Sequence, residues 1–233
     1  MTRWMRIVSS ILLLGIIAGG VVAIILWSQY PGRFPILAIE VQDELKRVTE
    51  SDIAEACQTH LDKGFFWVDI EGVQQSITRL PWVASASVRR VWPARILVSI
   101  QEQVPQARFG EEGVLNTEGL IFFPDKSTIP GQLPRFNGPK ERAKEMLQQY
   151  HAVLEKLGPI GLSVVELNLA PNGTWQMRLN NGIAIILGKA ELNERLTKFV
   201  LAYQVKLQTL ISKIAYVDLR YTNGLAIGWK TGV

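Results

Sequence analysis

The longest hydrophobic run lies near the start of the chain. Residues 7–27 (IVSSILLLGIIAGGVVAIILW) contain no charged residue. An α-helix of this length rises about 30 Å, which matches the hydrocarbon layer of a bilayer. The run therefore predicts a transmembrane helix from Ile7 to Trp27, preceded by a stub at residues 1–6. Gly15 and Gly19 have the small-xxx-small spacing that lets membrane helices approach closely, although glycine in such a helix often has no packing role.

Basic residues beside this run predict its orientation. Arg3 and Arg6 precede the run and only Arg33 follows it closely, so the positive-inside rule places residues 1–6 in the cytoplasm. Trp4 on one side, with Trp27 and Tyr30 on the other, fits a pair of interfacial aromatic anchors. The alternative is a signal peptide cleaved after Ala23, but the apolar run continues too far for a usual one.

Hydrophobic positions in residues 36–103 predict a small module of order β-α-α-β-β. Residues 28–35 contain two prolines and a glycine and read as a linker. Alternating apolar residues predict strands at 36–42, 82–92 and 96–100. Two helices lie between the first two strands: one follows a Thr49–Asp52 capping box and places Cys57 on its apolar face, and the other follows Asp69.

Residues 104–233 predict a second module of mixed α/β type. Helical periodicity is found at 139–157 and 192–207, and strand patterns at 163–169, 174–179, 183–187 and 214–221. Asn-Gly and Asn-Asn-Gly turns separate the middle strands, and a hairpin is expected around 116–119. The fold class is thus α+β, with a largely antiparallel sheet and two helices packed on one face.

Composition adds little chemistry to this picture. Hydrophobic residues make up 48% and charged residues 20% of the chain, which fits folded modules. Three of the 25 basic residues precede residue 34; the remaining 22 face 21 acidic residues, so no nucleic-acid surface is expected. Cys57 is the only cysteine, and His60 and His151 fall on separate helices. Since no catalytic or phosphate-binding motif occurs, we expect no enzyme, no cofactor and no metal site.

The C-terminal stretch RYTNGLAIGW, residues 220–229, reads as two strands joined by a tight turn. Leu225, Ile227 and Trp229 alternate and are expected to seal the core, while Ala226 and Gly228 leave a shallow groove on the other face. Only Lys230 would blunt the edge of this last strand. The pattern therefore predicts an edge to which a partner can add a strand, with Tyr221 as a nearby anchor.

Arg89, Arg90 and Arg95 flank the Trp92-Pro93 turn and form a second candidate surface. They could contact a partner or lipid headgroups. The solvated tip of a hairpin is the favoured interpretation, because the sequence places few aromatic residues beside them.

Three stretches carry a resemblance to a known family. RLPWVASASVRRVWPARILVSIQEQVPQARF (79–109) resembles the second half of the POTRA domain of FtsQ/DivIB bacterial division proteins, Gram-negative members above all. GVLNTEGLIFFP (113–124) and AYVDLRYTNGLAIGW (215–229) are similar to the start and the end of that family's β domain. The resemblance implies a POTRA domain at 36–103 and an FtsQ-type β domain at 104–233.

The resemblance also implies a function. Members of this family are single-pass inner-membrane scaffolds of the divisome, enriched at the septum, whose periplasmic β domain binds FtsB, the coiled-coil partner of FtsL. Carried over, the FtsB contact would involve Tyr221, Asn223, Gly224, Ala226, Gly228 and Trp229, and other division proteins would bind through the POTRA domain and the membrane helix. Relatives carry a longer polar tail where this chain stops at Val233, so either that tail is dispensable or the partner contact differs slightly. The alternatives are a POTRA-bearing component of a transport or secretion system and a cleaved, soluble periplasmic binder.

Overall fold

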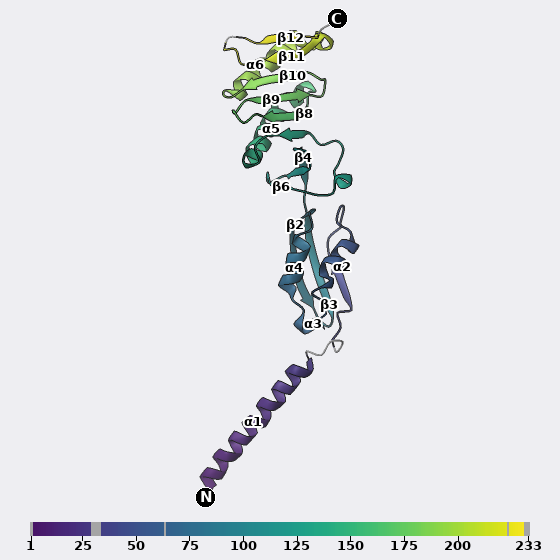
Figure 1. The fold of residues 1–233 in the computed structure, drawn as a ribbon, viewed down its shortest axis with the longest axis vertical. Helices are drawn as coiled ribbons and strands as arrows, with labels where there is room; N and C mark the ends of the chain where they lie inside the picture. The colour runs from purple at the N-terminus through teal and green to yellow at the C-terminus, as the bar shows by residue number, and fades with distance from the viewer. Residues whose placement is uncertain (1, 29–33, 63, 223, 231–233) are drawn as a thin grey trace. The chain divides into compact units, whose positions relative to one another are not determined.

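A computed structural model of the chain describes residues 2–28, 34–62, 64–222 and 224–230. It divides into two compact units, residues 1–102 and 103–233, which are drawn in Figure 1. The first unit begins with helix α1 (Thr2–Ser28), in which Ile7–Ser28 has a mean hydropathy of 2.6 and no buried residues. Within the described residues, α1 is the helix long and apolar enough to cross a membrane, as the sequence predicted.

The rest of the first unit is a small sheet covered by helices. Its described elements are β1 (Ala38–Val41), α2 (Glu50–Gln58), α3 (Gly64–Trp67), α4 (Ile70–Thr78), β2 (Val83–Val91) and β3 (Arg95–Glu102). The strand order is β1-β3-β2, with β1 parallel and β2 antiparallel to β3. The predicted β-α-α-β-β order is confirmed, with α3 as an additional single turn between the two helices.

Local interactions explain where the helices of this sheet begin. The Thr49 hydroxyl accepts from the Asp52 N–H at 3.2 Å, and the Asp52 carboxylate accepts from the Thr49 N–H at 2.9 Å, which forms the predicted capping box of α2. The Asp69 carboxylate caps α4 by accepting from the Gly72 N–H at 3.0 Å. Both helices turn an apolar stripe inward, and Cys57 is fully buried in the core.

The second unit is built on one large sheet. Its described strands are β4 (Pro105–Phe109), β5 (Gly113–Asn116), β6 (Ile121–Phe122), β7 (Arg135–Asn137), β8 (Val164–Leu169), β9 (Trp175–Leu179), β10 (Ala184–Gly188), β11 (Ile214–Asp218) and β12 (Ala226–Trp229). Their order is β12-β11-β10-β9-β8-β7-β4-β5-β6. Among these described strands five neighbouring pairs are antiparallel and three are parallel, so the sheet is largely antiparallel, as predicted.

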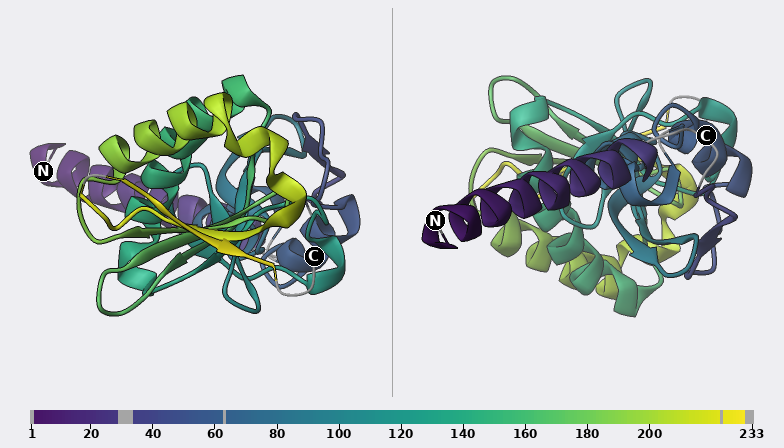
Figure 2. Two further views of the ribbon diagram at one scale, coloured as in Figure 1. Left: turned by 90° about the horizontal axis from the view of Figure 1, so that it is seen from above. Right: turned by 90° about the horizontal axis from the view of Figure 1, so that it is seen from below.

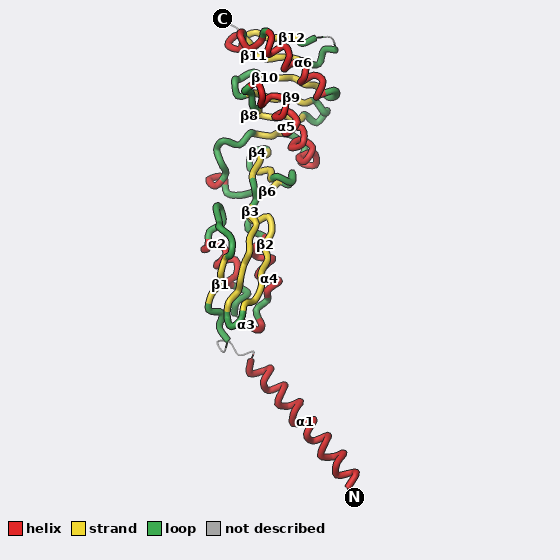
Figure 3. Tube along the Cα trace, turned by 180° about the vertical axis from the view of Figure 1, so that it is seen from behind, coloured by secondary structure: helices red, strands yellow, loops and turns green. Residues whose placement is uncertain are grey.

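Helices α5 (Ala143–Leu157) and α6 (Leu192–Val205) cover one face of this sheet, as the left view of Figure 2 shows. Short 3-10 turns connect the elements, at Lys126–Thr128, Lys140–Arg142, Gly158–Ile160, Leu207–Thr209 and Ile211–Lys213; Figure 3 traces the connecting loops in green. The core between sheet and helices holds Phe136, Met146, Leu167, Met177 and Phe199, each at most 2% exposed. Burial of this apolar surface is the main source of the unit's stability.

The predicted final hairpin differs from the structure in its turn. β11 ends at Asp218 rather than Tyr221, and β12 begins at Ala226, so the described residues 219–222, 224 and 225 lie outside both strands instead of extending them to a tight turn. The cause lies in Asp218, whose Oδ1 accepts from the Arg220 backbone N–H at 3.0 Å. Such a local side-chain turn competes with the strand ladder and ends it.

Candidate functional site

Strand β12 forms one edge of the large sheet and lies at the end of the strand stack in Figure 1. It pairs with β11 alone among the described strands. The Lys230 N–H donates to the Lys213 carbonyl at 2.8 Å. Because backbone groups alternate between the two sides of a strand, the N–H and C=O of Ile227 and Trp229 then point away from β11. These groups form an open edge of the kind that accepts an added strand.

Of the three residues predicted to seal the core at this end of the chain, two do so. Leu225 and Ile227 are partly buried against the core of the unit. Trp229 is 55% exposed, so the prediction that it seals the core is wrong. It lies at the last position of an edge strand, and the register of β11 shifts beside it at Ala215. A large ring there has neighbours on one side only, and the bulge bends its strand partner.

The outward face of β12 is not the groove that the sequence predicted. A Cβ atom at Gly228 would lie 2.0 Å from Cε1 of Tyr216, because the Tyr216 ring already covers this glycine. Tyr216 is directly opposite Gly228 in the β11–β12 register. Glycine therefore serves here to admit a ring, in the manner of a cross-strand glycine–aromatic pair. Tyr216 could not be predicted from the sequence as part of this site, because its position over Gly228 depends on the register of β11 and β12.

The hollow at this end of the sheet lies in the preceding loop instead. Tyr221, Thr222, Gly224, Leu225 and Ala226 line it, with Tyr221 58% exposed. The Lys198 ammonium of α6 donates to the Thr222 carbonyl at 2.8 Å and ties the loop to the unit. Asn223 lies outside the described residues. Of the sequence-predicted partner residues, the structure thus brings Tyr221, Gly224 and Ala226 to one hollow and places Gly228 and Trp229 farther along β12.

A charged pair fixes the start of this loop. The Asp218 carboxylate is 7% exposed and accepts from Nη2 of Arg220 at 2.6 Å and from Nε at 2.9 Å. These hydrogen bonds hold the pKa of Asp218 below its usual value, with a smaller contribution from Arg195. The same bonds raise the pKa of Arg220, whose charge also lies near the hydroxyls of Tyr216 and Tyr221. The Asp-x-Arg spacing is a local signal that could have identified this pair from the sequence.

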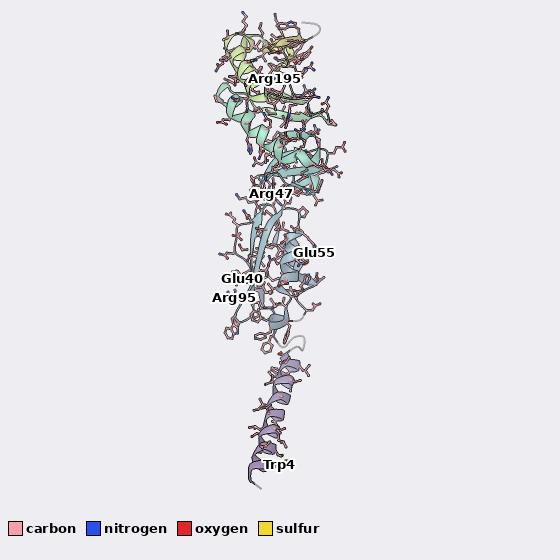
Figure 4. The ribbon with its side chains drawn as sticks, turned by 90° about the vertical axis from the view of Figure 1, so that its left-hand side faces the viewer. Trp4, Glu40, Arg47, Glu55, Arg95 and Arg195 are labelled. Carbon is pink, nitrogen blue, oxygen red and sulfur yellow. The ribbon has the colours of Figure 1, made fainter. Side chains whose placement is uncertain are left out.

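The arginines of the second candidate surface are partly engaged within the first unit. Arg95 pairs with Glu40 at 2.8 Å, as Figure 4 illustrates, and Arg90 donates to the Val68 carbonyl at 2.7 Å. Arg89 is exposed.

Other sequence candidates show no chemistry in the described part of the chain. Gly15 and Gly19 have nothing within 4 Å of an added Cβ. His60 contacts Ser76 at 3.0 Å and lies 3.8 Å from Asp69. No group of three His, Cys, Asp or Glu side chains is arranged for a metal ion within the described residues.

Comparison with known proteins decides the family. The sequence model of "Cell division protein FtsQ/DivIB, C-terminal" matches residues 104–220, and that of "POTRA domain, FtsQ-type" matches residues 34–103. The chain belongs to the FtsQ/DivIB family. It is similar to the cell division protein FtsQ of Shewanella oneidensis, with 38% identity over 84% of this chain and 74% of that protein. The FtsQ proteins of Aliivibrio fischeri (33%, covering 91% and 82%) and Coxiella burnetii (32%, covering 86% and 82%) are similar to it as well.

Membership in the FtsQ/DivIB family gives the chain a role in bacterial cell division. This family is generally non-catalytic. Together with helix α1, it indicates a single-pass protein of the inner membrane. The C-terminal family model ends at Arg220, so the hollow beside Tyr221 and strand β12 follow the matched range.

Proposed function

We propose that this chain is a non-catalytic scaffold of the divisome that holds the FtsB/FtsL pair through strand addition at the outer edge of β12. Residues 34–233 lie in the periplasm and residues 1–6 in the cytoplasm. By holding this pair at the septum, the chain links early and late division proteins and controls septal peptidoglycan synthesis. Further division proteins bind through the POTRA domain and α1.

The open edge of β12 is the observation that carries this proposal. The outward backbone groups of Ile227 and Trp229 offer main-chain hydrogen bonds to an incoming strand. Exposed rings lie on both sides of these groups, with Tyr221 58% and Trp229 55% exposed. Aromatic side chains of this kind supply much of the binding energy at protein interfaces.

The other residues of the proposed site position this edge. Gly228 admits the Tyr216 ring, which leaves a partly exposed aromatic surface beside β12. Gly224 and Ala226 contribute a hollow into which a partner side chain fits. The Asp218–Arg220 pair fixes the start of the segment that carries Tyr221.

Co-purification of FtsB and FtsL from membranes tests this proposal. The Tyr221→Ala chain is expected to lose most of the bound pair, because a ring at the interface is removed. Phe123→Ala is a matched control: Phe123 is 56% exposed and follows β6, the opposite edge of the sheet. Unchanged recovery of FtsB and FtsL with Tyr221→Ala, at equal protein levels in the membrane, contradicts the proposed interface.

A further inference from the structure

One end of the first unit carries a patch of exposed apolar side chains, here called the aromatic pole. Its members come from three separate segments of the unit: Phe34, Leu37, Phe66, Trp67 and Trp92; Arg89 precedes Trp92 by three residues. Trp92 is 76%, Leu37 73% and Phe66 49% exposed. Such large apolar residues at one end of a small module mark an interaction surface.

Short contacts hold these three segments together. The Phe65 N–H donates to the Phe34 carbonyl at 2.8 Å, and the rings of Phe34 and Phe66 meet edge to face at 4.9 Å. The Leu37 N–H donates to the Ala94 carbonyl at 2.8 Å, which joins the start of the module to the turn that bears Trp92.

The third link is made by an arginine. The Arg90 side chain reaches the Val68 carbonyl, next to Trp67, at 2.7 Å. The pole is therefore a defined surface of the fold rather than a set of unrelated side chains.

Chain connectivity places this pole near the end of α1. Ser28 and Phe34 are six residues apart, a separation of at most about 22 Å for a fully extended chain. Two contacts within the first unit bring them closer: the Trp67 indole N–H donates to the Ser28 hydroxyl at 3.2 Å, and the rings of Trp27 and Phe34 lie 6.1 Å apart. The headgroup layer of a bilayer begins where an apolar helix such as α1 ends.

The composition of the pole fits that layer. Tryptophan prefers the membrane–water interface, where its ring is buried among glycerol and headgroup atoms. Arg89 makes no ion pair or side-chain hydrogen bond within the described residues and is available for lipid phosphate. The Arg95 guanidinium pairs with the Glu40 carboxylate, and the Asp69 carboxylate caps α4 by accepting from the Gly72 N–H. The aromatic rings are therefore the main groups at this end that are available for a lipid contact.

We propose that the aromatic pole docks on the headgroup layer of the same bilayer that α1 spans, with the Trp92 ring inserted at the interface. This inference rests on the membrane anchoring that belongs to the proposed function. Docking restrains the orientation of the POTRA domain on the membrane. It also explains why the tip of the β2–β3 hairpin carries an exposed tryptophan between arginines.

Lipid quenching of a fluorophore tests the docking. The full chain carrying Leu37→Cys is labelled with an environment-sensitive fluorophore and reconstituted into vesicles of phosphatidylethanolamine and phosphatidylglycerol that contain a lipid with a nitroxide near its headgroup. Ser85→Cys is the reference: Ser85 is exposed on β2, seven residues from Trp92 and so about 23 Å along the strand. Cys57 is buried, and burial raises the pKa of its thiol to about 11, so it stays unlabelled.

The docking predicts severalfold stronger quenching at position 37 than at position 85. Adding Trp92→Glu to the Leu37→Cys chain is expected to remove most of that difference, whereas adding Ser85→Glu leaves it unchanged. Equal quenching at both positions, or no effect of Trp92→Glu, overturns the docking.

Flotation of the vesicles separates this outcome from failure of the anchor. A chain that floats with the vesicles but shows no selective quenching contradicts the docking alone. A chain that does not float contradicts the membrane anchoring, and the docking with it.

Discussion

Gly228 offers the sharpest test of how the β12 edge is built. An alanine Cβ at this position would lie 2.0 Å from Cε1 and 2.4 Å from Cδ1 of the Tyr216 ring, well inside van der Waals contact. Gly228→Ala therefore forces the ring away from β12. Overpacking of this kind costs about 1–3 kcal/mol, offset by about 0.5–1 kcal/mol because alanine restricts the unfolded chain.

The two terms predict a net destabilisation of about 1 kcal/mol in the wild-type background, within a range of about 0–2.5 kcal/mol. In a Tyr216→Ala background the clash is absent, and the same substitution is expected to stabilise by about 0.5–1 kcal/mol. The two residues are thus coupled by about 1–3 kcal/mol, typical of side chains in direct contact.

Native-state hydrogen exchange measures this local effect in the full chain. The Lys230 amide, which donates to Lys213 at 2.8 Å, reports opening of the β11–β12 ladder. Gly228→Ala is expected to speed its exchange roughly fivefold in the wild-type background, and to slow it when Tyr216 is alanine. Gly131→Ala serves as the control, because an added Cβ there meets nothing within 4 Å. Equal acceleration in both Tyr216 backgrounds would show that the Tyr216 ring does not oppose a side chain at position 228.

Three further substitutions test the Asp218–Arg220 ion pair, the hydrogen bonds of Glu102 and the outward N–H of Trp229. Hydrogen bonds from Arg220 lower the pKa of Asp218, so its ionised form stabilises the fold above the usual value of 3.8, and this contribution is lost as pH falls through the lowered pKa. Asp218→Asn is expected to reduce the free energy of unfolding by about 1–2 kcal/mol at pH 7, measured by circular dichroism, and the difference is expected to shrink as pH falls below 3.8. A difference independent of pH contradicts the ion pair. Glu102→Gln is expected to lower the free energy of unfolding by about 1.5–3 kcal/mol, because the Glu102 carboxylate accepts from the N–H groups of Arg47 and Val48 at 2.8 Å each. Hydrogen exchange at residues 46–48 is then faster in the variant, and unchanged exchange contradicts the prediction. Trp229→Pro removes an outward N–H that Trp229→Ala retains, so it is expected to weaken FtsB/FtsL binding about fivefold more than Trp229→Ala does. Slow exchange of the Lys230 amide checks that the β11–β12 ladder is intact in both variants. Equal affinities of the two variants would exclude a hydrogen bond from this N–H.

The sequence predicted those features of the fold that depend on residues close together in the chain. The Thr49–Asp52 capping box and the Asp69 cap each lie within one helical turn, and the burial of Cys57 follows from the stripe of α2. The single turn α3 was missed, because a helix of four residues has no periodicity to detect. Its first residue, Gly64, has a φ of +72°, which favours glycine.

The candidate site was predicted only in part because it depends on pairing between strands. Trp229 is exposed because of the bulge at Ala215 and the edge position of β12. The alternation of Leu225, Ile227 and Trp229 in the sequence predicts neither of these features. The arginine cluster likewise appeared to lack aromatic neighbours. Phe66 and Trp67 reach it through a tertiary contact, the Arg90–Val68 hydrogen bond, across 22 residues.

The proposed addition of an FtsB strand at the outer edge of β12 can be tested by hydrogen exchange resolved to single amides, with and without the FtsB/FtsL pair. Strand addition predicts that the outward Ile227 and Trp229 amides slow markedly on binding, while the Lys230 amide, already bonded to Lys213, changes little. Binding that leaves the Ile227 and Trp229 amides exchanging as fast as in the free chain would contradict strand addition at β12.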